Sequence, residues 1–202
     1  LVDADNYFTH ARDAMLKAKR QILLIGWDFD ARIHLGDAAD GGPPALGDFV
    51  MWLARRRPTL HVRLLRWDTG AFKAMFRGST LLTILRWKMH PRITLRLDGK
   101  HPLASSHHHK IVVIDDCLAF CGGIDVTEGR WDTPDHRADE PRRTLRSGEI
   151  GQPWHDMSAV LTGDAARALG QLARARWDRA NDGPITEPPS DTDPDALWPP
   201  TI

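Results

Sequence analysis

The stretch His-His-His-Lys-Ile-Val-Val-Ile-Asp-Asp, residues 107–116, decides how the rest of the chain is interpreted. Its centre, Ile111 to Ile114, is a short and mostly β-branched apolar run, which is typical of a buried strand. Side chains alternate along a strand, so His108 and Lys110 leave the same face. An imidazole beside a fixed positive charge suits attack on phosphorus, because one group forms the new bond while the other neutralises the oxygens.

Asp115 lies at the far end of the same predicted strand. Seven residues of extended chain span roughly 23 Å at about 3.3 Å each, so Asp115 cannot touch His108 if the strand is straight. The pair Asp115-Asp116 instead predicts a turn into a second strand, Leu118 to Cys121, closed by a side-chain-to-backbone hydrogen bond. If His108 is a nucleophile, the carboxylate that orients its ring must come from elsewhere in the chain.

Helices and strands alternate along most of the sequence. Hydrophobic periodicity and breaker residues predict helices over about 3–20, 45–57, 71–88 and 164–180, the first capped by Asp3 or Asp5, and strands over about 21–27, 60–67, 93–97, 111–114, 118–121 and 155–161. Residues 126–152 are expected to form a long polar loop. The alternation predicts an α/β domain in which helices flank a mixed, largely parallel β-sheet, the hairpin at 111–121 making the sheet mixed.

The chain is expected to divide into one folded unit and a tail. Residues 1–182 are predicted to form a single catalytic domain, long enough to bury a hydrophobic core. Residues 183–202 hold six of the fourteen prolines and several aspartates, so a linker or a disordered end is expected there. Because the chain starts at Leu1 and not at a methionine, we expect it to be a fragment, and a removed leader stays an open alternative.

Composition restricts the classes of partner. The formal net charge is zero, so no basic field favours nucleic acid. No apolar run reaches the length of a membrane span. Cys117 and Cys121 lie on one face of one predicted strand and are expected to be free thiols of a reducing compartment. A metal site in the histidine run 107–109 is not expected, because alternate side chains point to opposite faces and no carboxylate or cysteine stands at zinc spacing.

His108, Lys110 and Asp115 together form the motif H-x-K-x4-D, which is followed by the segment Gly122-Gly123-Ile124-Asp125. This pattern resembles the signature of the phospholipase D superfamily. The resemblance implies the phospholipase D fold, and only one copy of the motif is present. The chain would then be the first of two lobes that form one active site across a pseudo-two-fold axis, with the tail leading towards the missing lobe.

Two later segments strengthen the resemblance. Residues 129–137, with the letters GRWDTPDHR, and residues 153–156, with the letters PWHD, are similar to landmarks of plant- and animal-type phospholipases D. The resemblance extends from about residue 2 to residue 181, and its specific motifs are confined to 106–156.

The resemblance implies a role for each motif residue. His108 would be the nucleophile, and Lys110 would donate a charge-assisted hydrogen bond to a non-bridging phosphoryl oxygen. Asp156 would accept the Nδ1 hydrogen bond of His108 and fix its tautomer, which leaves Nε2 free to attack. Asp115 is carried over as the acid of the catalytic motif, although its spacing favours a turn.

The residues that follow the motif are open to two interpretations. Gly123 and Asp125 are expected to contact the substrate together with Lys110. Asp125 stands where the superfamily often has Asn, and an anion repels phosphate, so Asp125 is expected either to be protonated or to bond to His or Lys. Three further side chains are expected either to line the substrate entrance or to form a packing cluster: Arg130, Trp131 and His136.

The implied reaction is a two-step displacement through a covalent phosphohistidine. The substrate would be a glycerophospholipid at a membrane surface, converted to phosphatidic acid and an alcohol or transferred to another alcohol. No metal or other cofactor is expected, because lysines of both lobes neutralise the phosphoryl oxygens. The second histidine, the acid for the leaving alcohol, would come from the second lobe in cis or from a second protomer, so the isolated chain is expected to be inactive.

Two further classes of function stay open. One is a single-motif homodimer, either a nuclease or a cardiolipin-synthase-like phosphatidyltransferase. The other is a non-enzymatic half-lobe that binds phospholipid headgroups or protein. The expected location is the cytoplasm or the membrane periphery, with secretion open because of the possible missing leader.

Overall fold

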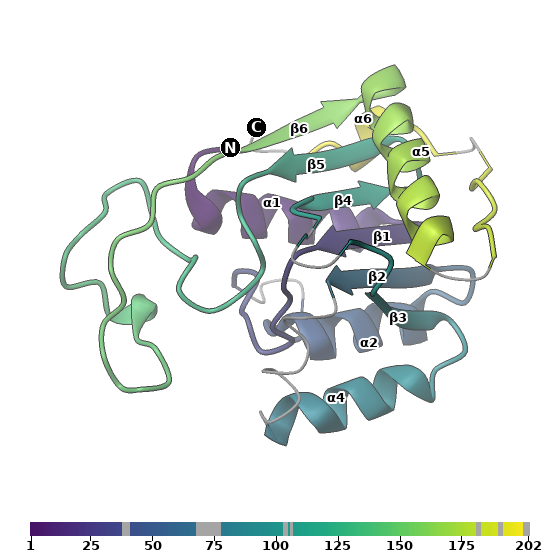
Figure 1. Ribbon diagram of the computed structural model, residues 1–202. Helices are drawn as coiled ribbons and strands as arrows, with labels where there is room; N and C mark the ends of the chain where they lie inside the picture. The colour runs from purple at the N-terminus through teal and green to yellow at the C-terminus, as the bar shows by residue number, and fades with distance from the viewer. Residues whose placement is uncertain are drawn as a thin grey trace.

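A six-stranded β-sheet with helices on both faces forms the body of the protein (Figure 1). The structure, a computed structural model, describes residues 1–37, 41–67, 78–102, 105, 107–180, 183–189 and 192–199, without the side chains of 78–80. The strands are β1 (Gln21–Gly26), β2 (His61–Trp67), β3 (Ile93–Asp98), β4 (Ile111–Ile114), β5 (Leu118–Gly122) and β6 (Ser158–Thr162). The predicted α/β class is confirmed.

Strand direction changes in the middle of the sheet, whose order is β3-β2-β1-β4-β5-β6. Strands β1, β2 and β3 are parallel, whereas β4, β5 and β6 each run antiparallel to the preceding neighbour. Among the described strands, four point the same way, yet only two of the five neighbouring pairs are parallel. The sheet is therefore mixed, as predicted, but its parallel part is smaller than expected, because β6 returns beside the β4–β5 hairpin and not beside the parallel strands.

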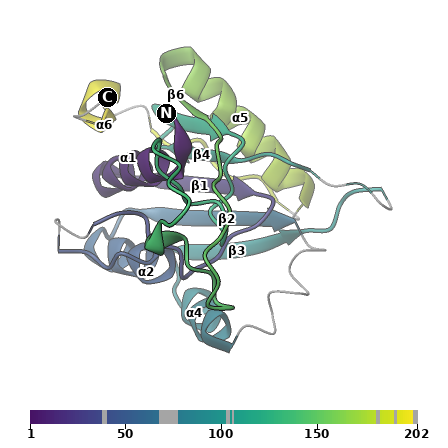
Figure 2. The ribbon, with the colours of Figure 1, turned by 90° about the vertical axis from the view of Figure 1, so that its left-hand side faces the viewer.

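Alternating apolar side chains build a core on each face of the sheet. Ile22 and Leu24 of β1 point into the larger core, and Leu23 and Ile25 point into the smaller one. Figure 2 shows helices on both sides of the sheet. These are α1 (Asp3–Lys17), α2 (Leu46–Arg56) and α4 (Gly78–Lys88) over the larger core and α5 (Gly163–Ala180) over the smaller one.

The predicted elements agree with the structure apart from their ends. Helix α1 starts after Val2 without a side-chain cap, and Asp3 instead takes a left-handed backbone with φ of 62°. The first part of the predicted helix 71–88 lies outside the described residues. Strand β6 starts at Ser158 and not at His155, because the preceding residues are hydrogen-bonded to the start of α1.

The long segment between β5 and β6 is ordered by one buried arginine. It contains the short 3₁₀ helix η1 (Pro141–Arg143) and crosses in front of the strands in Figure 2. Arg143 Nε donates to the Gly151 carbonyl at 3.0 Å, and its Nη1 donates to Asp132 Oδ1 at 2.7 Å. Its Nη2 donates to the carbonyls of Arg137 and Ala138. The predicted polar loop is thus built around the buried Arg143 guanidinium group, which is hydrogen-bonded to residues that precede it in the loop and to Gly151, which follows it.

The end of the chain packs against the domain, which corrects the expectation of an unstructured tail. A short helix, α6 (Pro194–Leu197), places Leu197 in the larger core with 1% of its surface exposed. Thr192 Oγ1 donates to Asp115 Oδ2 at 3.2 Å, and Lys17 Nζ donates to the Trp198 carbonyl at 2.8 Å. The sequence did not indicate this packing, because the segment is rich in proline and shows no hydrophobic periodicity. It is held by one buried leucine and a few long-range hydrogen bonds, which leave no pattern in the sequence.

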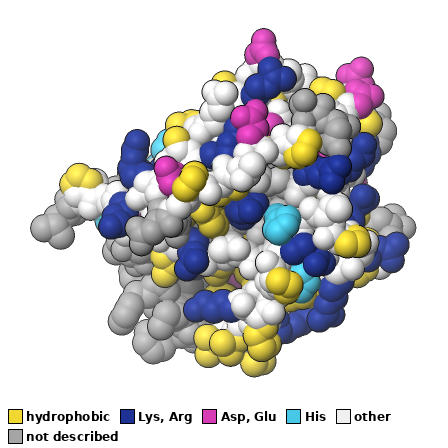
Figure 3. Space-filling model, turned by 90° about the vertical axis from the view of Figure 1, so that its right-hand side faces the viewer, with side chains coloured by type: hydrophobic (Ala, Val, Ile, Leu, Met, Phe, Trp, Pro, Cys, Tyr) yellow, Lys and Arg dark blue, Asp and Glu magenta, His cyan; other side chains and the backbone are white. Residues whose placement is uncertain are grey.

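Charge is unevenly distributed over the surface. Figure 3 shows the side of the molecule opposite the segment between β5 and β6, where Lys and Arg side chains are spread over the middle of the face. The acidic side chains visible there lie mainly towards its upper part.

Cys117 and Cys121 are free thiols, as predicted. Among the described residues, no helix combines the length and the apolar character that crossing a membrane requires.

Candidate active site

The residues before β4 point alternately to the two faces, as predicted. The rings of His107 and His109 lie on one side with centroids 5.8 Å apart. His107 is buried near Asp98, and burial, opposed in part by the Asp98 carboxylate, lowers the pKa of His107 to about 4. His107 is therefore a neutral structural side chain at neutral pH. His108 is exposed, and its ring packs edge-on against Trp27 with centroids 5.9 Å apart.

Lys110 is buried and paired with Asp125. Its Nζ lies 2.9 Å from Asp125 Oδ2, and both side chains are 4% exposed. The other carboxylate oxygen of Asp125 accepts the Asp28 amide at 3.4 Å. Of the alternatives for Asp125, the structure contains the bond to lysine. The Lys110 Nζ atom is itself buried, so this pairing fixes the amine in place, and the predicted contact of Lys110 with a phosphoryl oxygen stays a prediction.

Tyr7 lies close to Lys110 and Asp125, and the sequence did not indicate it as a residue of the candidate site. Its side chain lines a small cavity shared with Lys110 and Asp125. Burial, reinforced by the Asp125 carboxylate and by Cys121, raises the pKa of Tyr7, so its phenol is protonated at neutral pH. The only signal in the sequence is its place on the apolar stripe of α1, and that signal indicates packing, not chemistry.

The glycine pair after β5 brings the segment before β6 against the motif. The Gly122 amide donates to the Lys110 carbonyl at 3.3 Å, and the Gly123 amide donates to the Met157 carbonyl at 3.1 Å. A Cβ atom on Gly123 would lie 2.2 Å from Asp156 Oδ1, which is far inside van der Waals contact. Glycine therefore lets the Asp156 carboxylate lie over this part of the chain, and the predicted contact of Gly123 with substrate stays a prediction.

Asp156 lies at the same end of the strands as His108 but does not make the hydrogen bond to His108 that was expected. Its Oδ1 accepts the Met157 amide at 2.7 Å, and its backbone amide donates to Asp3 Oδ1 at 3.1 Å. Among the described residues, no hydrogen bond joins Asp156 to His108. Because β4, β5 and β6 are adjacent and antiparallel, His108, Gly123 and Asp156 nevertheless come from neighbouring chain segments at the same end of these strands.

Asp115 has a structural position, and its predicted catalytic role stays a prediction. It closes the β4–β5 turn, where Asp115 and Asp116 both have positive φ, as in a type I′ turn. Its buried carboxylate accepts three backbone amides at 2.6–2.9 Å, those of Lys19, Arg20 and Gln21. The turn was predicted, but the amides belong to the entry into β1 and not to the turn itself.

Arginine–aromatic contacts dominate the segment after Asp125. The Arg130 guanidinium lies over the Trp154 ring at 3.9 Å, and the Arg142 guanidinium lies over the Trp131 ring at 4.1 Å. Trp131 also lines a hollow of about 190 Å³ between this segment and residues 30–33. Of the two interpretations of these side chains, packing holds for Arg130, and Trp131 both packs and lines a cavity.

The chain is similar to phospholipases D over most of its length. A family profile described as "Phospholipase D" matches residues 14–191. Phospholipase D C of Dictyostelium discoideum is 28% identical over 210 residues, which cover 90% of this chain and 13% of that protein. Human phospholipase D1 is 28% identical over 141 residues, which cover 67% of this chain and 13% of that protein. The chain thus spans about an eighth of the length of these curated relatives.

Solved structures share the fold at low sequence identity. The phospholipase D family member Nuc from Salmonella typhimurium superimposes with a TM-score of 0.54 at 16% identity, covering 87% of this chain and 89% of Nuc. Phosphatidylserine synthase of Haemophilus influenzae Rd KW20 gives a TM-score of 0.52 at 12% identity, covering 98% of this chain and 40% of that one.

Proposed function

The chain belongs to the phospholipase D family, and from this premise we propose that it supplies one half of a phosphodiesterase site that cleaves glycerophospholipids at a membrane surface. The observation that carries the proposal is the arrangement just before the start of β4. An exposed His108 stands two residues from a buried ammonium group, Lys110, which is fixed by Asp125. A nucleophile that is accessible, next to a cation that is preorganised, is what in-line attack on a phosphodiester needs.

The proposed reaction has two displacements at phosphorus. His108 Nε2 forms a bond to phosphorus as the bond to the leaving alcohol breaks, and an acid outside this chain donates the proton to that alcohol. The outside group, now deprotonated, takes a proton from a water molecule, which attacks the phosphohistidine; the phosphorus–nitrogen bond breaks, and phosphatidic acid leaves. Lys110 stabilises the charge on the phosphoryl oxygens in both steps. An acceptor alcohol in place of water would give transphosphatidylation.

A second lobe is proposed because only one H-x-K-x4-D motif occurs in the 202 residues. We expect the isolated chain to release no phosphatidic acid from phosphatidylcholine vesicles, because it supplies a nucleophile without the matching acid. The measurement is product release by the chain alone over a wide range of protein concentration, beside the parent protein in which the chain is joined to a second lobe. Turnover per chain that rises with protein concentration would instead favour the homodimeric transferase or nuclease.

Turnover by the chain alone that is independent of its concentration would contradict the half-site proposal. The generic diester bis(4-nitrophenyl) phosphate, assayed in parallel, separates loss of chemistry from loss of lipid binding. A protein that binds vesicles tightly but cleaves neither substrate, in the chain or in the parent, would instead be the non-enzymatic headgroup-binding module.

We further propose that Asp156 orients His108 during turnover. Its carboxylate lies against Gly123, which follows β5, and β5 is hydrogen-bonded to β4, the strand that His108 precedes. In the parent protein, Asp156→Asn is expected to lower kcat on the order of 10²-fold with little change in KM, because the imidazole loses the acceptor that fixes its tautomer. Asp156→Glu should restore part of kcat. Equal losses for both variants, accompanied by a lower melting temperature, would indicate a structural role only.

A further inference from the structure

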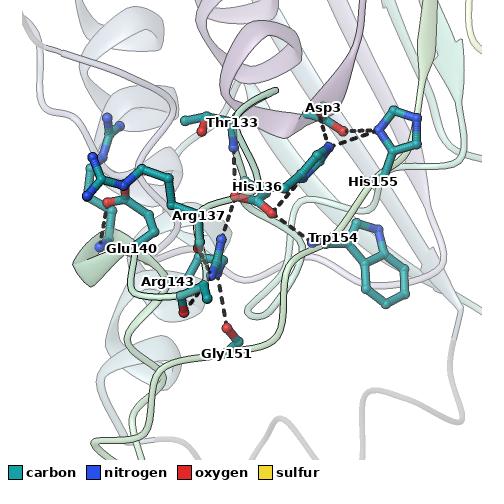
Figure 4. Close-up of polar contacts among 12 residues, drawn as sticks. Asp3, Thr133, His136, Arg137, Glu140, Arg143, Gly151, Trp154 and His155 are labelled. Carbon is teal, nitrogen blue, oxygen red and sulfur yellow. Dashed lines mark hydrogen bonds and ion pairs between the residues drawn. The ribbon is translucent and has the colours of Figure 1, made fainter.

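Asp3, His136 and His155 converge although they come from three separate parts of the chain (Figure 4). Asp3 is the first residue of α1, His136 lies in the segment between β5 and β6, and His155 precedes β6. His136 Nε2 lies 3.2 Å from His155 Nδ1 and 3.3 Å from Asp3 Oδ2. His155 Nδ1 lies 3.0 Å from Asp3 Oδ1. Two imidazole nitrogens and a carboxylate thus face one point.

The spacing of these atoms matches tetrahedral metal coordination. Ligand atoms at about 2.0–2.1 Å from a tetrahedral Zn²⁺ lie about 3.3 Å from one another. The three separations among Asp3, His136 and His155 are 3.0, 3.2 and 3.3 Å. The set of two imidazoles and one carboxylate is also the donor chemistry of Zn²⁺ and related transition metals, whereas Ca²⁺ and Mg²⁺ prefer oxygen ligands alone.

Asp132 orients one of the three ligands in the manner of a metal site. His136 Nδ1 lies 3.0 Å from Asp132 Oδ2, so the ring donates its Nδ1 proton to the carboxylate and turns Nε2 towards Asp3 and His155. A carboxylate behind the ligating histidine is the usual support of a metal-bound imidazole.

Asp3 provides independent evidence, because part of its charge has no hydrogen-bond donor. The side chain is fully buried, and its Oδ2, although 3.3 Å from His136 Nε2, accepts no hydrogen bond from the described residues. A buried carboxylate oxygen without a donor is strongly unfavourable unless a cation lies beside it. The backbone of Asp3 is also held in a left-handed conformation, φ 62°, by the hydrogen bond from its amide to the Asp156 carbonyl.

We propose that Asp3, His136 and His155 form a binding site for a divalent transition metal, best matched by Zn²⁺. His155 is 65% exposed, which leaves the fourth position of a tetrahedron open to solvent. The cation would join α1, the segment between β5 and β6, and the approach to β6. Both backbone groups of Asp156 are bonded to Asp3, through the amide at 3.1 Å and the carbonyl at 2.8 Å. The metal would therefore be structural and would fix the residue that follows His155.

Zinc binding by the whole 202-residue chain, purified without a polyhistidine tag and stripped with a chelator, tests the proposal. Titration calorimetry and metal analysis after dialysis should show one equivalent of Zn²⁺ that His155→Ala and His136→Gln both lack. Asp132→Asn should weaken this equivalent by roughly 10- to 100-fold. His61→Gln, which changes an exposed histidine at the start of β2, should leave it intact. The chain has ten histidines, so the difference between variants is the decisive quantity.

Two controls keep the result unambiguous. Because His155 is exposed, the variant His155→Ala is expected to fold as the wild type does. Equal melting temperatures of the two proteins in the presence of chelator would show this. Zn²⁺ should then raise the melting temperature of the wild type only, and Co²⁺ should give the visible absorption of a tetrahedral site in the wild type only. Equal zinc affinity and stoichiometry in wild type and His155→Ala would overturn the proposal. Failure of the wild type to retain Zn²⁺ would also overturn it and leave an ion-pair cluster alone.

Discussion

In the two-lobe protein proposed above, replacing His108 with alanine is expected to lower kcat/KM by at least about 10³-fold, because His108 is the nucleophile proposed for the covalent step. The side chain is exposed and, within the described part of the chain, is packed only edge-on against Trp27. Its removal should therefore leave the melting temperature nearly unchanged. Product release from phosphatidylcholine vesicles and from the small diester measures the loss.

The matched control is His109→Ala, one residue away on the opposite face of the same segment. This variant should keep turnover within a few-fold of the wild type, because its ring faces away from Lys110. Capture of a phosphorylated histidine after rapid acid-free quenching should succeed for wild type and His109→Ala and fail for His108→Ala. Turnover of His108→Ala within tenfold of the wild type would contradict the assignment of the nucleophile.

Replacing Asp115 with alanine is expected to destabilise the isolated chain by about 4 kcal/mol, with little direct effect on chemistry. The buried carboxylate accepts three backbone amides and the Thr192 hydroxyl. Hydrogen bonds to a charged group contribute about 1.5–3 kcal/mol each, and donors left buried without acceptors add to the loss. Alanine also tolerates the positive φ of 51° less well than aspartate does.

Urea unfolding of Asp115→Ala, Asp115→Asn and the exposed control Asp139→Ala measures this loss. Asn keeps the side-chain volume and tolerates a left-handed backbone, so it should lie between alanine and the wild type. Asp139→Ala should stay within about 0.5 kcal/mol of the wild type. A variant of Asp115 with wild-type stability and no turnover would show that the aspartate of the motif acts in catalysis after all.

Local patterns were sufficient to predict the six strands and the longer helices, but not the short helix α6. The apolar, β-branched runs that became β1 and β4 are short and uninterrupted, and the alternation within 107–110 follows from extended backbone alone. The turn at Asp115 was likewise predictable, because Asp-Asp between two strands favours left-handed residues. Direction within the sheet was less accessible, since the position of β6 depends on where the chain returns after more than thirty residues.

The sequence alone did not predict which residues pair with the buried charged side chains. Lys110 and Asp125 are fifteen positions apart, and local reasoning left open whether that carboxylate is neutral or paired. The amides of residues 19–21 that bind Asp115 lie about 95 positions earlier. The Arg143–Asp132 pair had no signal either, because isolated charged residues in a polar loop have no periodicity.

By itself, the sequence determined the α/β class, the strand that presents His108 and Lys110, and membership of the phospholipase D family. These depend on neighbours in the chain and on a contiguous motif. The tertiary structure alone decided that Lys110 is paired with Asp125, that Asp115 supports the entry to β1, and that Asp3, His136 and His155 meet at one point. The physical reason is that a charged side chain that is buried on folding pairs with a residue of the segment that lies beside it in the fold. Which segment lies there is set by the packing of the whole domain.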